Sequence, residues 1–293
     1  MPTPLSKLGE NAVLERLLSH LSPHAPLITG PGDDCAVIPG DEEWDILLKT
    51  DVVVENIHFT PDTAPERIGH KAIARAISDI AAMGGLPEYA LITLLMHPSR
   101  SLESAEGIYR GISRTAARFG ISVAGGETSS LPTDGLVINV ALTGRIERGQ
   151  AILRSGGNPG DIICVSGPLG GSFPSGHHLD FEPRLNLSRF FMQEGPRPTA
   201  MMDLSDGLGT DLPRLARASD CGFQLNLDKL PLNPACSPQQ GLTDGEDYEL
   251  LFTISPENLA RLTGSCPYSI YPIGALTDSA TTTPVEGWQH FRS

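Results

Sequence analysis

The sequence is poor in cysteine, and its cysteines do not have the spacing of a metal site. There is no Cys-x-x-Cys pair and no histidine cluster with the spacing of zinc ligands. An odd number of widely separated cysteines favours buried free thiols over a disulfide framework. The five cysteines of this 293-residue chain are Cys35, Cys164, Cys221, Cys236 and Cys266.

Long apolar runs are absent as well. No run reaches the roughly 18–20 residues that a membrane-spanning helix needs, and Met1 to Glu10 lack the basic and apolar regions of a signal peptide. The hydrophobic content of 40% and the mean hydropathy of -0.08 are typical of globular proteins. The sequence therefore predicts a cytoplasmic protein without a membrane partner.

Positive charge is scarce. The chain has 21 Lys and Arg against 35 Asp and Glu, a net charge of -14. A nucleic-acid surface would need a basic stripe, and none is present, so we expect no nucleic-acid partner. The glycine-rich stretch at residues 153–161 precedes a predicted strand and lacks the Gly-Lys-Ser/Thr of a P-loop. If the substrates are anions, metal ions must lie between them and the protein.

Strands and helices alternate through the first half, which predicts an α/β domain of about 145 residues. A chain of this length exceeds one average core, so we expect two domains, 1–148 and 149–293. Expected helices are 5–21, 65–83, 102–119 and one led by Leu208. Expected strands are 35–38, 46–54, 89–96, 121–124, 136–144, 162–166, 223–227, 248–254 and 268–273.

Two further segments carry structural expectations. Leu14, Leu17, Leu18 and Leu21 share one helix face, so the first helix should dock without taking part in chemistry. Residues 167–178 are rich in Gly, Pro and Ser, which favours a mobile loop with His177 and His178 exposed to solvent.

The stretch Gly30-Pro-Gly-Asp-Asp34 places two adjacent aspartates on a turn. The nearest basic residue downstream is Lys49, so the sequence indicates unpaired negative charge that a divalent cation would satisfy. An exposed turn is the alternative, because Asp is favoured there by its hydrogen bonds to the backbone. Between these aspartates, Asp34 is the better ligand candidate, and Asp33 fits a turn role.

Other carboxylates also lie at turns or at the ends of elements. Asp51 interrupts a β-prone strand, where it is either a wet-face residue or a metal ligand together with Thr50. Asp79 lies among apolar neighbours late in a helix, so it needs a buried partner. Asp206 could be a helix N-cap, whereas Asp203 in its apolar context could not.

Taken together, these carboxylates predict an all-oxygen site. Oxygen ligands without His or Cys select Mg²⁺, which is commonly shared with substrate phosphates, and this suggests phosphoryl transfer. Arg154 is the residue expected to grip a nucleotide phosphate. The aromatic tail around Trp288 is either a packed terminus or a stacking surface for a heterocycle. The carboxylates are Asp33, Asp34, Asp51, Asp79, Glu127, Asp203 and Asp206.

An ordered set of motifs over nearly the whole chain resembles the thiamine-monophosphate kinase family, within the superfamily of aminoimidazole ribonucleotide synthetase. The motifs are Gly30-Pro-Gly-Asp-Asp34, Lys49-Thr-Asp51, Glu55-Asn-Ile-His58-Phe59, Ser78-Asp-Ile-Ala-Ala-Met-Gly84, Gly125-Gly-Glu-Thr128, Arg154-Ser-Gly-Gly-Asn-Pro-Gly-Asp161, Asp203-Leu-Ser-Asp-Gly-Leu208 and Gly245-Glu-Asp-Tyr-Glu-Leu-Leu-Phe252.

The resemblance implies a two-domain fold, with an N-terminal α/β domain whose strands build a dimer barrel and a C-terminal α+β domain. It implies a homodimer that uses Mg²⁺ to transfer the γ-phosphate of ATP to thiamine monophosphate. Asp51, Asp79 and Asp206 would be catalytic. The implied metal ligands are Asp34, Thr50, Asp51, Asp79, Glu127, Asp203 and Asp206. The implied nucleotide contacts are Tyr109, Gly126, Glu127, Arg154 and Ser205, and the implied thiamine-phosphate contacts are His58, Glu246 and Trp288.

The chain departs from the family pattern in three places. Lys49 stands where the family usually has Ser, so that one metal is lost or replaced by the ammonium. Glu127 stands where Asp is usual, and residues 167–198 form a short segment over the substrate. Two alternatives therefore stay open: an ATP-dependent synthetase of the same superfamily acting on another acceptor, and a nucleotide-binding paralogue without activity.

Overall fold

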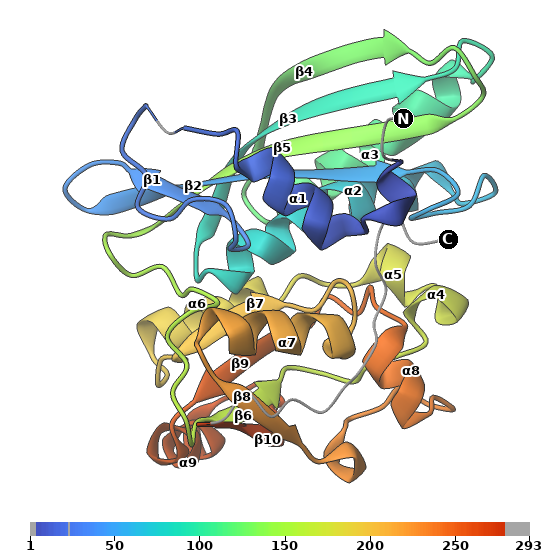
Figure 1. The fold of residues 1–293 in the computed structure, drawn as a ribbon. Coiled ribbons are helices and arrows are strands. Elements are labelled where there is room, and N and C mark those ends of the chain that lie inside the picture. The colour runs from blue at the N-terminus through green and yellow to red at the C-terminus, as the bar shows by residue number, and fades with distance from the viewer. Residues whose placement is uncertain (1–3, 23, 279–293) are drawn as a thin grey trace.

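The computed structural model describes residues 4–22 and 24–278. Its upper half in Figure 1 is a five-stranded sheet in the order β1-β2-β5-β3-β4. Strands β3 and β4 are parallel, and the other neighbours are antiparallel. The strands are β1 Ala36–Pro39, β2 Trp44–Val54, β3 Leu86–Met96, β4 Ser122–Ser130 and β5 Leu136–Glu147.

A second five-stranded sheet forms the other half, in the order β7-β9-β6-β10-β8, with every neighbouring pair antiparallel. Its strands are β6 Ile162–Val165, β7 Ala200–Asp203, β8 Gly222–Leu225, β9 Leu250–Ile254 and β10 Tyr271–Thr277. The helices of this half are α4 Ser172–Ser175, α5 His177–Asp180, α6 Leu185–Gln193, α7 Leu208–Ala218, α8 Pro238–Thr243 and α9 Pro256–Ser265. The predicted combination of an α/β and an α+β unit is confirmed.

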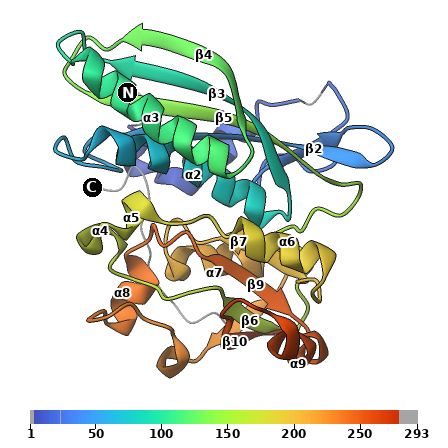
Figure 2. The ribbon, with the colours of Figure 1, turned by 180° about the vertical axis from the view of Figure 1, so that it is seen from behind.

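Helix α2 (Pro65–Ala82) lies between the two halves (Figures 1 and 2). It packs on the first sheet together with α3 (Leu102–Arg118), and its other side contacts α5, α6 and β7. Of its 18 residues 13 are buried, and these include polar side chains. The buried Lys71, Ser78 and Asp79 must therefore find partners inside the protein.

The face of the first sheet that is turned away from α2 and α3 is open. Side chains alternate along β2, so Leu47 and Val53 enter the core while Leu48 and Val52 point outward. Tyr89 and Leu91 of β3 are 56% and 51% exposed. An apolar open face of this kind is unusual for a free surface.

The N-terminal helix is shorter than predicted. A 3₁₀ turn, η1 (Leu5–Lys7), is separated from α1 (Glu10–Leu18) by Gly9, whose φ of 73° breaks the helix. The expected docking face is wrong for the described residues, because its four leucines are 36–64% exposed. They are Leu14 at 46%, Leu17 at 59%, Leu18 at 36% and Leu21 at 64%.

Three expectations for the loops are also wrong. The strand expected to end at residue 124 continues to Ser130, so residues 125–128 lie within β4. Residues 167–178 contain α4 and the start of α5, and Asp247 Oδ1 fixes this segment by accepting from Gly170 N (2.9 Å) and Ser172 Oγ (2.7 Å). His178 is 4% exposed and stacks on Phe173. Helices α6, α8 and α9 were not anticipated.

The expectation of buried free thiols is confirmed for three cysteines and wrong for Cys236 and Cys266, which are partly exposed. All five cysteines are free, and Cys35, Cys164 and Cys221 are buried. Within residues 4–22 and 24–278, no helix combines the length and the apolar character that crossing a membrane requires. The domain boundary predicted after residue 148 falls in the segment between β5 and β6.

Candidate active site

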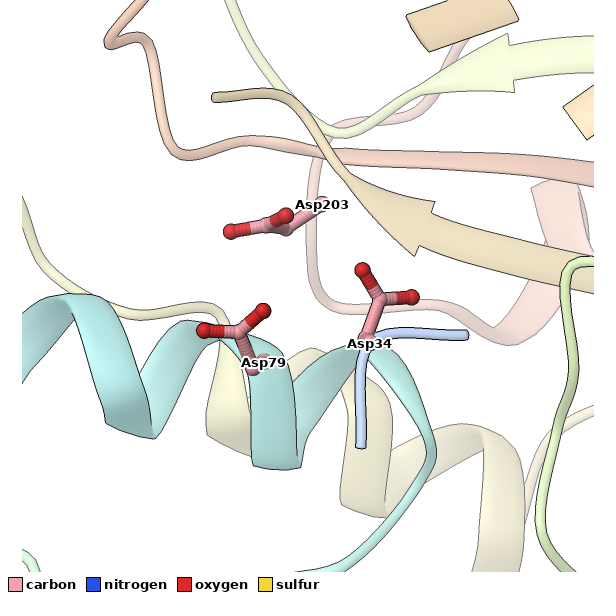
Figure 3. Close-up of side chains that lie close together, drawn as sticks. All are labelled: Asp34, Asp79 and Asp203. Atoms are coloured by element: carbon pink, nitrogen blue, oxygen red, sulfur yellow. The ribbon is translucent and has the colours of Figure 1, made fainter. Parts of the chain in front are cut away.

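Three aspartates from distant parts of the chain meet where α2 approaches β7 (Figure 3). Asp34 precedes β1, Asp79 lies in the last turn of α2, and Asp203 ends β7. Each offers a carboxylate oxygen, and these oxygens lie within 4.8 Å of one another. The exposed fractions are 3%, 6% and 4%. Carboxylates buried this closely repel one another unless protons or cations compensate them.

The pKa values in the cluster reflect burial and this repulsion. Burial, and after it the charge of Asp34, raises the pKa of Asp203 to about 6, although a 2.7 Å hydrogen bond from Ser78 Oγ acts in the opposite direction. Burial raises the pKa of Asp79 as well, against the lowering effect of Lys49. The neighbouring Asp33 has a pKa of about 6, raised by burial and by Asp34. A bound divalent cation would offset the repulsion between these carboxylates.

Four basic side chains reach the acidic residues from elsewhere in the chain. The prediction that the Asp33–Asp34 charge is unpaired is therefore wrong, because its partner Arg154 lies 120 positions after Asp34 in the sequence. The pairs are Lys49 Nζ with Asp79 Oδ1 at 2.6 Å, Arg154 Nη2 with Asp34 Oδ1 at 2.6 Å, Arg75 Nη2 with Asp51 Oδ1 at 3.2 Å, and Arg214 Nη1 with Asp206 Oδ2 at 2.5 Å.

Arg154 holds the Gly-Asp-Asp turn with both its backbone and its side chain. Its backbone N–H donates to the two Asp33 carboxylate oxygens at 3.3 and 3.1 Å. Its guanidinium donates to both oxygens of Asp34, from Nη2 at 2.6 Å and from Nε at 3.4 Å. Asp33 thus stabilises the turn, while Asp34 belongs to the aspartate cluster.

The Ser205–Asp206 turn is built on a buried carboxylate. Asp211 is 0% exposed, and its Oδ2 accepts the backbone N–H groups of Ser205 (3.1 Å) and Asp206 (3.0 Å). The N-cap of α7 is Gly207, so the alternative that Asp206 caps this helix is wrong. The Asp206 carboxylate instead accepts from Arg214. Asp211 was not predicted as a site residue, because acids are common in the first turn of a helix and only the tertiary fold buries this one.

A cavity of about 360 Å³ opens beside this turn. It brings together His58, Ser205, Asp206 and Glu246, all of which the sequence singled out. The complete lining is Ile57, His58, Arg75, Phe173, Pro174, Ser205, Asp206, Gln240, Asp244, Gly245, Glu246 and Tyr248. The lining includes the rings of Phe173 and Tyr248 and three carboxylates against one arginine, which suits a ligand that is planar and cationic.

Two residues at the cavity are held by a lysine that the sequence analysis missed. Lys71 of α2 is 0% exposed, and its Nζ donates to the carbonyl oxygen of His58 at 2.6 Å and to Glu246 Oε2. Burial lowers the pKa of Lys71 to about 8, against the raising effect of Glu246. His58 Nδ1 accepts from Val54 N at 3.0 Å, so the proton of the neutral ring is on Nε2.

Other predicted residues lie outside the cluster and the cavity. The Thr50 hydroxyl donates to Asn139 Oδ1 at 3.0 Å on the open face of the first sheet. The register β2-β5-β3-β4 places Glu127 on this face too, through the pairs Asn139–Thr93 and Thr93–Glu127. Tyr109 of α3 is 38% exposed. Trp288 lies outside the described residues.

Gly126 has a structural reason for being glycine. It lies in β4 with a φ of 159°, and a Cβ atom there would lie 1.8 Å from the carbonyl oxygen of Ile92. Close packing of β4 on β3 therefore requires glycine, whether or not a nucleotide also binds there.

The comparisons with known proteins extend over most of the chain. Residues 32–146 match the N-terminal domain of AIR synthase related proteins, and residues 189–285 match the C-terminal domain. A curated relative from Rhodopirellula baltica, named thiamine-monophosphate kinase, is 38% identical over 250 residues, which are 79% of this chain and 77% of the relative. This chain belongs to the thiamine-monophosphate kinase family.

A second thiamine-monophosphate kinase, from Bacillus subtilis, is 34% identical over 279 residues, which are 85% of this chain and 85% of the relative. Among solved structures, AaThiL complexed with AMPPCP and TMP has a TM-score of 0.86 at 29% identity, covering 99% of both chains. The family resemblance and the two-domain fold expected from the motifs are confirmed. Because the match to AaThiL covers 99% of this chain, it includes the cavity and the aspartate cluster.

Proposed function

We propose that this protein transfers the γ-phosphate of ATP to the phosphate of thiamine monophosphate, giving thiamine diphosphate and ADP. The observation that carries the proposal is the buried Asp34–Asp79–Asp203 cluster next to the cavity formed by residues 205–206 and 244–248. Relatives over most of the chain are named thiamine-monophosphate kinase, and the similar AaThiL structure contains AMPPCP and TMP.

The residues of the cluster fit Mg²⁺. All three candidate ligands are carboxylates, whose oxygens are hard donors, and the described residues bring no His or Cys ligand to this cluster. Burial and the charge of Asp34 raise the pKa of Asp203, and a bound divalent cation would favour its ionised form against both. Mg²⁺ held here would neutralise phosphate charge during transfer. Asp206 lines the cavity, and Asp51 is paired with Arg75, which lines it as well.

The protein side chains have a limited task in this reaction. A phosphate acceptor is ionised at neutral pH, so no general base is required, and the neutral His58 ring is needed only as a hydrogen-bond donor. The main obstacle is repulsion between two polyanions that must align for in-line transfer. Arg154, which is paired with Asp34 in this structure, can instead direct its guanidinium to a nucleotide phosphate. Ser205 and Asp206 are held in place by Asp211.

The cavity accounts for the choice of acceptor. Thiamine monophosphate carries a cationic thiazolium and a planar pyrimidine. Phe173 and Tyr248 line the cavity with aromatic side chains, and Glu246 and Asp244 offer negative charge. Tyr248 is itself fixed by stacking on Phe181, with ring centroids 3.9 Å apart. A pre-formed wall of this kind reduces the entropy lost on binding.

We also propose that the protein is a homodimer that works in the cytoplasm. The open face of the first sheet exposes Leu48, Val52, Tyr89 and Leu91, and a second copy would cover these side chains. It would also give Thr50 and Glu127, which lie on that face, an environment that one chain does not supply. Five free cysteines fit a reducing compartment.

An assay with several acceptors tests the proposal. The purified protein is incubated with ATP, Mg²⁺ and either thiamine monophosphate or other phosphate and amide acceptors. Thiamine diphosphate as the product supports the kinase, and turnover with another acceptor alone supports a synthetase. ATP binding without any product supports the paralogue without activity.

A further inference from the structure

Lys49 is the basic residue most closely tied to the aspartate cluster by rigid elements. It lies within β2 on the same face as the buried Leu47 and Val53, so its side chain points toward α2 and not toward solvent. Its Nζ lies 2.6 Å from Asp79 Oδ1. The Lys49 side chain is 21% exposed and that of Asp79 is 8% exposed.

Both partners are anchored by secondary structure. Lys49 pairs with Leu142 in the ladder between β2 and β5, and Asp79 is in the last part of α2, where residues 76–82 are all buried. Arg154, in contrast, comes from the segment that links β5 and β6. A guanidinium on a linking segment can exchange its partner for a ligand, whereas an ammonium fixed between a strand and a helix stays beside the cluster.

The position is unusual for a lysine. Mid-strand positions facing a core favour β-branched or other apolar side chains, as the neighbouring Leu47 and Val53 illustrate. An enclosed ion pair is seldom more stable than a hydrophobic pair of similar volume, because both charges lose hydration. Stability alone therefore does not explain why a charge is placed here.

We propose that the Lys49 ammonium takes the place of one divalent cation in this active site. It supplies a permanent positive charge to Asp79, so that the site holds one metal ion fewer than its carboxylates could otherwise bind. The inference rests on the proposed metal-dependent phosphoryl transfer and specifies its charge balance. Lys49 acts through Asp79 and is a positioning residue.

The test counts bound metal without turnover. Mn²⁺ bound per chain is measured from the electron paramagnetic resonance signal of free Mn²⁺, with AMPPCP present and no acceptor. Lys49→Met removes the charge and keeps the length of the side chain, so we expect about one additional Mn²⁺ per chain relative to the parent. Lys49→Arg keeps the charge and should bind as many ions as the parent.

Two further variants keep the result interpretable. Lys229→Met removes the same group from an exposed position of the second half, and should leave the count unchanged. Lys49→Gln retains a hydrogen-bond donor toward Asp79 and replaces Lys49→Met if that variant does not fold. Equal counts in the parent and in the folded uncharged variant would overturn the proposal. Because no acceptor is present, failure to phosphorylate thiamine monophosphate would not change this readout.

Discussion

Arg154 and Asp34 are 120 positions apart in the sequence, and Nη2 of the first lies 2.6 Å from Oδ1 of the second. The pair joins the segment after β5 to the turn before β1, at the edge of the aspartate cluster. A guanidinium so placed neutralises Asp34 before ligands arrive and is within reach of an incoming phosphate. This relationship connects the fold to the proposed reaction.

Replacing Arg154 should weaken nucleotide binding. Loss of a charged, two-pronged hydrogen bond costs about 2 kcal/mol, so Arg154→Ala should raise the KM for ATP roughly 30-fold. Arg154→Lys keeps the charge but cannot donate two parallel hydrogen bonds, so its KM for ATP should lie between those of the parent and of Arg154→Ala. Steady-state kinetics with varied ATP measures this. Arg118→Ala, which breaks an exposed pair with Glu182, is the control. An unchanged KM in Arg154→Ala would show that the guanidinium serves Asp34 alone.

Replacing Asp203 should separate activity from stability. Asp203→Asn removes one carboxylate from the cluster and should lower kcat by roughly 10²–10³-fold, in the range seen for groups that stabilise transferred charge. The pKa of Asp203 is raised to about 6 by burial and by Asp34, so removing its charge relieves repulsion. We therefore expect the Tm to stay level or to rise. A large fall in Tm with retained turnover would assign Asp203 a structural role.

Asp247 should make the stability depend on pH. Burial raises its pKa from 3.8 to about 7, against hydrogen bonds from Ser172 and Gly170, and its Oδ2 has no partner among the described residues. The folded state binds this proton more tightly than the unfolded state. The resulting stabilisation is complete below about pH 4 and is lost as the pH rises through 7.

Asp247→Asn removes that dependence and keeps an oxygen for Gly170 and Ser172. Its Tm relative to the parent should increase by on the order of 5 °C between pH 4.5 and pH 8. Thermal unfolding at a series of pH values measures the difference. Asp228→Asn, at an exposed position, is the matched control. A Tm difference between Asp247→Asn and the parent that stays constant across this pH range would contradict the assigned pKa.

A charge on the open sheet face should prevent dimer formation. Leu91 is 51% exposed in the centre of β3, and Leu91→Arg would bury a charge at the proposed interface. We expect a monomer by light scattering, with reduced activity. Leu102→Arg introduces the same change at a leucine that is 69% exposed at the start of α3, and should leave the mass unchanged. A parent protein that is monomeric at working concentration would rule out the homodimer.

Much of the fold could be predicted because local patterns dominate it. Helix α2 was expected to end one residue later than it does, and the strands of the first sheet other than β4 were placed within three residues at each end, whereas β4 ends six residues later than expected. The prediction that the first helix docks through its leucines was wrong, because apolar periodicity shows that a helix has an apolar face but not what covers that face. The end of β4 was placed too early, at residue 124, because glycine pairs are typical of turns. Extended backbone also accepts them, and residues 125–128 lie within the strand.

The acidic residues of the site could be predicted from the sequence, but the basic residues that pair with them could not. Asp34, Asp79 and Asp203 were chosen because of their local contexts, and the structure brings these three together. Their partners Lys49 and Arg154 come from other elements, and no local pattern reports a contact across 30 or 120 positions. Lys71 and Asp211 were missed for the same reason, since burial of a charge is a property of the tertiary fold.

The most direct test of the proposed function follows phosphate from donor to acceptor. The protein is incubated with Mg²⁺, thiamine monophosphate and ATP labelled in its γ-phosphate, and the products are separated over time. The account predicts label in thiamine diphosphate, with one ADP formed per thiamine diphosphate and with transfer slowed roughly 10²–10³-fold in Asp203→Asn. Label released only as inorganic phosphate, or no label transferred while AMPPCP still binds, would contradict it.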